Sequence, residues 1–191
     1  MTRQDAYSTL LVYTKAPNLI NHHLAAEAAM RAIGKYYAGV TKKPIDLDMW
    51  GLTGLLHDAD YEITRNTPEK HTLYLEEKIG KLLPKEVMTA IKAHNFAYTK
   101  IQPVTPMDWA IYTCDELTGF VIACALVQKD KKMNMVTTEF ILKKMGDTSF
   151  AKSVDRKQIL LCEQSLGIKV NTYIQIVLSS MQAIAPTLGF A

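Results

Sequence analysis

Apolar residues recur every three or four positions along most of this chain, in segments that end at Gly, Pro or short polar turns. This spacing predicts amphipathic helices, because residues three and four apart lie on one face of a helix. Runs in which Val, Ile or Thr alternate with polar residues are missing, so no sheet is expected. The sequence therefore predicts an all-α fold.

The helices are expected to pack as a bundle of eight or nine within one domain over residues 1–191, a length that suits a single domain. Asn18 and Asp46 are suitable N-caps, and Pro68 suits a first helical turn. The expected helices cover residues 5–13, 19–37, 46–56, 68–83, 86–95, 107–128, 137–145, 155–166 and 169–185.

Composition and charge restrict the partners of the chain. Hydrophobic residues make up 48% and charged residues 21%, as in ordinary globular proteins. The 22 basic and 19 acidic residues leave a net charge of +3. This charge is too weak to indicate a nucleic acid polymer or a membrane as the partner. The lysine-rich turn at residues 129–134 is interpreted as a solvated loop.

The cysteines and the N-terminus indicate a cytoplasmic location. The three cysteines, at positions 114, 124 and 162, have neither a disulfide nor a zinc-site pattern and fit reduced thiols. The N-terminal residues lack the apolar core of a signal peptide. The most apolar stretch, residues 117–127, is shorter than the roughly 20 residues of a membrane span.

Four of the five histidines can be placed on the apolar face of their own helix, and two aspartates join them. They are His22, His57, His71, His94, Asp58 and Asp115. A carboxylate on an apolar face is costly unless it is paired or bound to a metal. Imidazoles and carboxylates that converge from separate helices are how bundles build metal sites. Plain core histidines remain the alternative at this point.

The order of these residues resembles the HD superfamily of metal-dependent phosphohydrolases, and more closely its small stand-alone HD-domain proteins. The segments that carry the resemblance are NLINHHLAAEAAMRAIG, WGLTGLLHDADYE, IKAHN, YTCDELTGFVIACALV and KKMGDTSFAKSVDRK. It implies a metal-site core at about residues 18–128 and buttressing helices at residues 129–191.

The resemblance also implies the metal ligands. One divalent transition metal, among Mn²⁺, Fe²⁺, Co²⁺, Ni²⁺ and Zn²⁺, would be held by His22, His57, Asp58 and Asp115. His71 and His94 would hold a second ion, with Asp58 as the bridge. A single metal remains possible, and His71 and His94 would then line the substrate pocket. His23 is expected to face elsewhere.

Further residues near these ligands are candidates for catalysis and substrate binding. Asp60 and Glu62 follow the His-Asp doublet and could orient the attacking water or hydrogen-bond a ligand imidazole, with Glu62 the better candidate for the water. The alternative is that both acids solvate a helix end. Lys70 and Lys92 are candidate phosphate contacts, or else surface lysines.

The resemblance implies a hydrolase that cleaves a phosphate ester or anhydride of a small metabolite, with a nucleotide as the favoured class. Two alternatives are an HD-fold di-iron oxygenase and a non-catalytic metal-binding sensor or interaction module. The sequence leaves the oligomeric state open, with a homodimer among the options.

Overall fold

The computed structural model describes residues 1–190, and this part of the chain contains helices and no strand. The predicted all-α class is therefore confirmed. The α-helices are α1 (Arg3–Tyr13), α2 (Pro17–Thr41), α3 (Leu47–Leu56), α4 (Tyr61–Thr64), α5 (Leu73–Ile79), α6 (Lys85–His94), α7 (Phe96–Thr99), α8 (Pro106–Leu126), α9 (Thr138–Met145), α10 (Arg156–Leu166) and α11 (Val170–Ala183). Four short 3-10 turns join them: Pro68–Lys70, Gly80–Leu82, Lys129–Lys131 and Met133–Met135.

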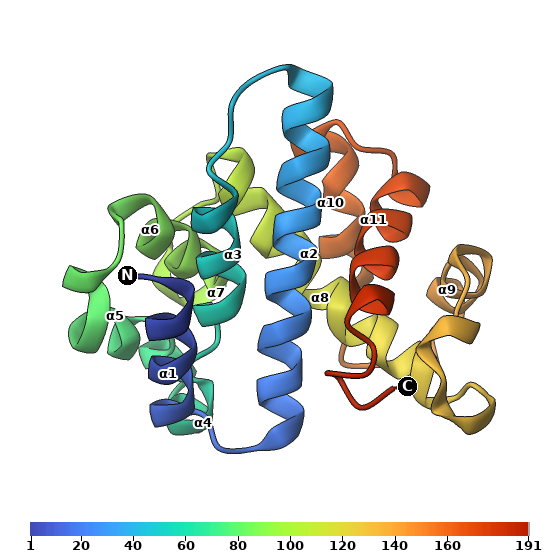
Figure 1. Cartoon of the computed structure of the whole chain (residues 1–191), viewed down its shortest axis with the longest axis horizontal. Helices are drawn as coiled ribbons and strands as arrows, with labels where there is room; N and C mark the ends of the chain where they lie inside the picture. Colours follow the sequence, from blue (N-terminus) through green and yellow to red (C-terminus); the bar gives the residue numbers. More distant parts are fainter. Residues whose placement is uncertain (191) are drawn as a thin grey trace.

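The long helix α2 runs through the middle of the molecule and separates two groups of helices (Figure 1). On one side lie α1 and α3 to α7, and on the other lie α9, α10 and α11. Helix α8 crosses between the groups and packs against α2, α6 and α10. Ile33, Leu55, Ile111 and Leu117 are fully buried in this shared core.

The prediction of one helix over residues 68–83 is wrong, because the helix is interrupted at Thr72. Thr72 has a φ of 70°, in the left-handed region that interrupts a right-handed helix. A 3-10 turn therefore precedes it and α5 follows it. His71 consequently lies outside any helix, so it is not on the apolar face of a helix as the sequence predicted.

Helices α2 and α3 approach each other closely because glycines lie between them. A Cβ atom on Gly34 of α2 would stand 2.9 Å from the ring of Trp50 in α3. A Cβ atom on Gly54 of α3 would stand 2.5 Å from the carbonyl oxygen of Ala26 in α2. This approach places the C-terminal end of α3 beside the first half of α2.

By length and composition α8 could cross a membrane, unlike the shorter stretch considered from the sequence. However, 56% of its most apolar window is buried inside the fold. A core helix of a soluble protein meets the same criterion, and α8 packs against α2, α6 and α10 among other helices. Packing in the core therefore explains the apolar composition of α8.

Candidate metal centre

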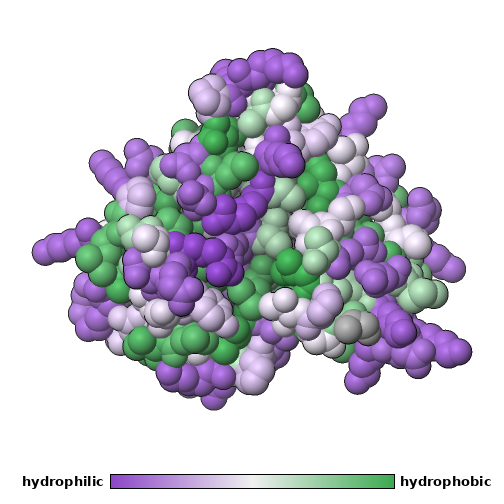
Figure 2. Space-filling view, in the orientation of Figure 1, coloured by the Kyte–Doolittle hydropathy of each residue, from purple (hydrophilic) through white to green (hydrophobic). Residues whose placement is uncertain are grey.

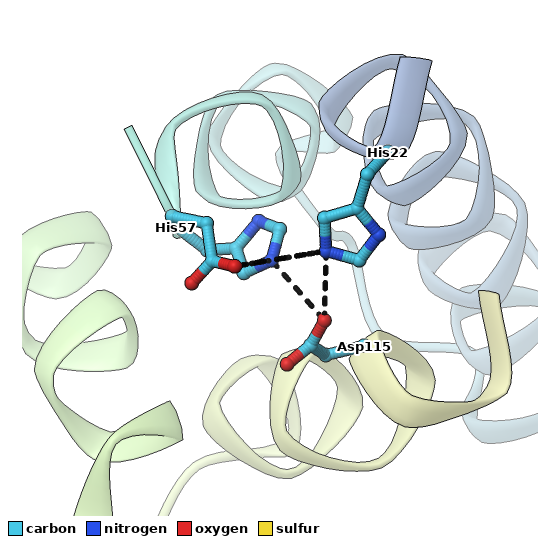
Figure 3. Close-up of side chains that lie close together, drawn as sticks. His22, His57 and Asp115 are labelled. Carbon is cyan, nitrogen blue, oxygen red and sulfur yellow. Dashed lines mark hydrogen bonds and ion pairs between the residues drawn. The ribbon is translucent and has the colours of Figure 1, made fainter. Parts of the chain in front are cut away.

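Three helices bring His22, His57 and Asp115 together (Figure 3). His22 lies in α2, His57 directly follows α3, and Asp115 lies in α8. The Oδ1 atom of Asp115 is 3.0 Å from Nε2 of His22 and 3.3 Å from Nε2 of His57. The two Nε2 atoms are 3.2 Å apart. Three ligand-type atoms from three helices therefore face one point.

Asp58 connects this group to a second pair of histidines through its two carboxylate oxygens. Its Oδ2 atom is 3.8 Å from Nε2 of His22 and 3.7 Å from Nε2 of His57. Its Oδ1 atom is 3.0 Å from Nε2 of His71 and 3.1 Å from Nε2 of His94. One carboxylate thus faces both groups, with one oxygen toward each.

The rings of His57 and His94 are held in the same way. The Nδ1–H group of His57 donates to the carbonyl oxygen of Gly54 at 2.8 Å, and that of His94 donates to the carbonyl of Ile91 at 2.5 Å. Both rings lie at the C-terminal end of a helix, where the last carbonyls have no intrahelical donor. Because Nδ1 carries the proton, Nε2 of the neutral ring keeps a lone pair for a metal.

Asp60 holds the ring of His71 from behind. Its side chain is fully buried, and its Oδ1 atom accepts from Nδ1 of His71 at 2.7 Å. Its Oδ2 atom accepts from the backbone amides of Thr72, at 2.9 Å, and Leu75, at 3.0 Å. Of the two roles considered for Asp60, this geometry favours the hydrogen bond to a ligand imidazole.

Two groups of side chains could each hold a metal ion. The first is His22, His57, Asp58 and Asp115, and the second is Asp58, His71 and His94. Within each group the ligand atoms lie within 4.8 Å of one another. The donors are imidazole nitrogens and carboxylate oxygens without thiolates, a set that suits a divalent transition metal. The side chains of His22, Asp58 and Asp115 are 17%, 17% and 21% exposed, so solvent reaches the centre.

In the metal-free protein, the carboxylates and imidazoles shift each other's pKa. Burial lowers the pKa of His57, but Asp58 and Asp115 outweigh burial and raise it to about 9. Burial likewise opposes protonation of His71, while hydrogen bonds to Asp58 and Asp60 raise its pKa to about 10. Burial favours neutral carboxyls, yet the adjacent histidines hold the pKa values of Asp58 and Asp115 well below their usual range. Without metal, the centre is therefore a network of ion pairs at neutral pH.

Glu62 lies outside both groups, and its contacts are not those expected of a residue that orients the attacking water. Its Oε2 atom accepts from the backbone amides of Lys15, at 2.7 Å, and Ala16, at 3.2 Å. These amides precede α2, which has no side-chain cap from its own N-cap residue. The contacts of Glu62 thus support the start of α2 and give no support to a water-orienting role.

Neither candidate lysine contacts the two groups. The ammonium of Lys92 pairs with Glu76 at 2.6 Å. Lys70 is exposed in the 3-10 turn before His71, and its side chain forms no hydrogen bond or ion pair in the described chain. Lys70 agrees with the surface-lysine alternative, whereas the Lys92 side chain is only 17% exposed and is engaged by Glu76.

His23 lies closer to the centre than the sequence analysis expected. It is 1% exposed, and its ring centroid is 5.4 Å from that of His57. Burial, followed by the charges of His57 and His22, holds its pKa well below the usual range. His23 belongs to neither ligand group, and its Nδ1 atom has no hydrogen-bond partner. It packs behind the ligands as a neutral ring.

Thr118 was not predicted from the sequence, but it contacts the centre. Its hydroxyl donates to the carbonyl of Asp115 at 2.8 Å and lies 3.5 Å from Nδ1 of His22. Its position three residues after Asp115 was the available signal, because such residues share a helix face.

Comparisons of the chain with protein-family models, curated proteins and solved structures find no match.

Proposed function

We propose that this protein is a metal-dependent phosphohydrolase of the HD type, acting on a small phosphorylated metabolite, with nucleotides as the first class to test. The observation that carries the proposal is the placement of Asp58, whose Oδ1 and Oδ2 atoms face separate groups of histidines. A carboxylate in this position is suited to bridge two ions. The order of His22, the His57-Asp58 doublet, His71, His94 and Asp115 supports the same proposal.

The side chains supply the positions that such a reaction needs. His22, His57, Asp58 and Asp115 would hold one ion, and Asp58, His71 and His94 would hold the other. Divalent ions bound there would polarise a phosphoryl oxygen and lower the pKa of a bound water. Asp60, Gly54 and Ile91 fix the rings of the ligands, so little reorganisation is needed when an ion binds.

The experiment is a metal analysis of protein purified without chelator, beside a phosphatase screen over nucleotides and sugar phosphates. We expect up to two ions per chain and turnover of one compound class. Asp115→Ala should lose metal and turnover together, and the exposed Glu69→Gln should keep both. Full metal content and full turnover in Asp115→Ala would refute the assignment.

A di-iron oxygenase is the second candidate, and one observation favours it. All ion-pair partners of Asp58 and Asp115 in the described chain are histidines. Neither carboxylate therefore holds a lysine or arginine side chain that could bind a phosphate beside the metal ions. Anaerobic loading with Fe²⁺ followed by exposure to O₂ separates the candidates, because only an oxygenase consumes O₂ when its substrate is added.

A further inference from the structure

A cavity of about 400 Å³ lies where α2 ends and where α3, α6 and α8 begin. The chain reaches it through Lys42, whose φ of 57° ends α2 and turns the next residues across the cavity. Figure 2 shows hydrophobic residues beside the hydrophilic loop that follows α2. The volume lies within the range of small-molecule sites, about 300–1,000 Å³.

The wall of this cavity is aromatic and aliphatic. Tyr37 and Trp50 form a stacked pair with ring centroids 6.4 Å apart and an interplanar angle of 30°. Ile45, Met49 and Met107 complete the apolar lining. Trp50 is 5% exposed, so its ring is held firmly. A flat apolar group is the kind of ligand that this wall fits.

Two exposed side chains of opposite charge line the same cavity, Lys43 and Glu86. In the described chain neither forms an ion pair, so both remain free for a ligand. Asp46 also lines the cavity, but its Oδ1 atom accepts from the backbone amides of Asp48, at 2.9 Å, and Met49, at 3.2 Å. Its carboxylate is thus engaged as the N-cap of α3.

We propose that this cavity binds a free aromatic amino acid. The ring would lie on the wall formed by Tyr37 and Trp50, the ammonium would pair with Glu86, and the carboxylate would pair with Lys43. A ligand with one charge would leave one of these two side chains unpaired, so a zwitterion complements the cavity better than a simple acid or amine.

The cavity is separate from the candidate metal centre. Trp50 and His57 are seven positions apart, and Met107 and Asp115 are eight positions apart, which correspond to about 10 and 12 Å along the helices. The amino-acid site therefore does not depend on the proposed phosphohydrolase activity. Binding should survive Asp115→Ala, and this variant distinguishes failure of one proposal from failure of the other.

The test uses the fluorescence of Trp50 in a Trp109→Phe background, because the chain has only two tryptophans. We expect a saturable change when L-phenylalanine is added, with calorimetry on the unmodified protein as a second measurement. Phenethylamine lacks the carboxylate and 3-phenylpropionate lacks the ammonium, so each should bind at least about tenfold more weakly, which corresponds to about 1.4 kcal/mol. L-Alanine lacks the ring and should not bind.

Matched variants test each charge separately. Glu86→Gln should weaken the binding of L-phenylalanine and leave the binding of 3-phenylpropionate unchanged. Lys43→Gln should weaken the binding of L-phenylalanine and leave the binding of phenethylamine unchanged. Lys152→Gln and Glu77→Gln are controls at exposed positions outside the cavity lining, and both should bind L-phenylalanine like the parent. The proposal is overturned if L-phenylalanine gives no saturable signal by about 10 mM, or if all analogues bind all variants equally.

Discussion

Gly54 of α3 lies directly against the backbone of Ala26 in α2, so that a Cβ atom at position 54 would be 2.5 Å from the Ala26 carbonyl oxygen. The carbonyl of Gly54 also accepts the Nδ1–H of His57. One residue thus sets both the distance between two ligand-bearing helices and the orientation of a ligand ring. His22 and His57 depend on this contact for their 3.2 Å approach.

Gly54→Ala should therefore separate α2 from α3 and weaken the first metal group. Overpacking of this kind costs about 1–3 kcal/mol of stability. The control is Gly119→Ala in α8, where an added Cβ meets no atom within 4 Å. That change should be neutral or stabilise by up to about 1 kcal/mol. Thermal melts and metal content measure both variants, and an unchanged Gly54→Ala protein would contradict the packing account.

Metal removal should lower the melting temperature, and Mn²⁺ or Fe²⁺ should restore it. An ion that binds only the native state, at a thousandfold excess over its Kd, stabilises by about 4 kcal/mol, or about 10 °C for a domain of this size. Asp58→Asn should largely abolish the response, because the amide lacks the charge that faces both groups. If metal-free protein melts at the same temperature with and without divalent ions, the metal-site hypothesis is refuted and the alternative of plain core histidines is favoured.

Metal affinity should rise with pH toward about 9 to 10. The pKa values of His57 and His71 in metal-free protein are about 9 and about 10, so protons compete with the ion for Nε2 at neutral pH. Calorimetry in buffers of different ionisation enthalpy should show proton release on binding at pH 7. Binding without proton release would contradict the raised pKa values.

The stability of metal-free protein should have the opposite pH dependence. Because folding raises the pKa of both histidines above 6.5, their contribution is fully present below pH 6.5 and is lost as pH rises through about 9 and 10. The melting temperature should therefore fall over this range without metal. With metal bound at pH 9 to 10, where the ion has displaced the protons, the fall should be smaller.

Asp60→Asn should release the second metal and destabilise the fold. An amide has one accepting oxygen, so it can keep either the bond from His71 or the bonds from Thr72 and Leu75, and its nitrogen faces donors on the other side. Loss of such ring support typically weakens metal binding 10–100-fold, and a buried unpaired donor costs about 1–3 kcal/mol. Ions per chain after dialysis and the melting temperature report the two effects. Retention of the second ion at full affinity would show that Asp60 does not position His71.

Glu62→Ala should lower the melting temperature slightly, because the backbone amides of Lys15 and Ala16 lose their acceptor, and it should leave metal content unchanged. If the melting temperature and metal content stayed the same while turnover fell sharply, Glu62 would act in catalysis instead.

The sequence predicted the all-α class and the convergence of His22, His94 and Asp115, because these residues lie on regular helices where periodicity determines the face. His71 reaches the centre differently. Its position depends on the left-handed backbone of Thr72 and on Asp60, whose carboxylate accepts a hydrogen bond from the backbone amide of Thr72, 12 residues away in the sequence. The partner of Glu62 lies 47 residues distant in the sequence. Such contacts follow from tertiary packing, and helical spacing contains no signal for them.

The break at Thr72 makes the two metal groups unequal in local stability. His22 and Asp115 belong to long helices in the core, whereas His71 lies in a short irregular segment. The Asp60 carboxylate and the side-chain amide of Asn95, which donates to the carbonyl of His71 at 3.0 Å, hold this segment. Segments of this kind open at lower free energy than the core around them. Local opening of this segment would release His71 while the remaining ligands stay in place, so we expect an ion bound by His71 and His94 to exchange without global unfolding.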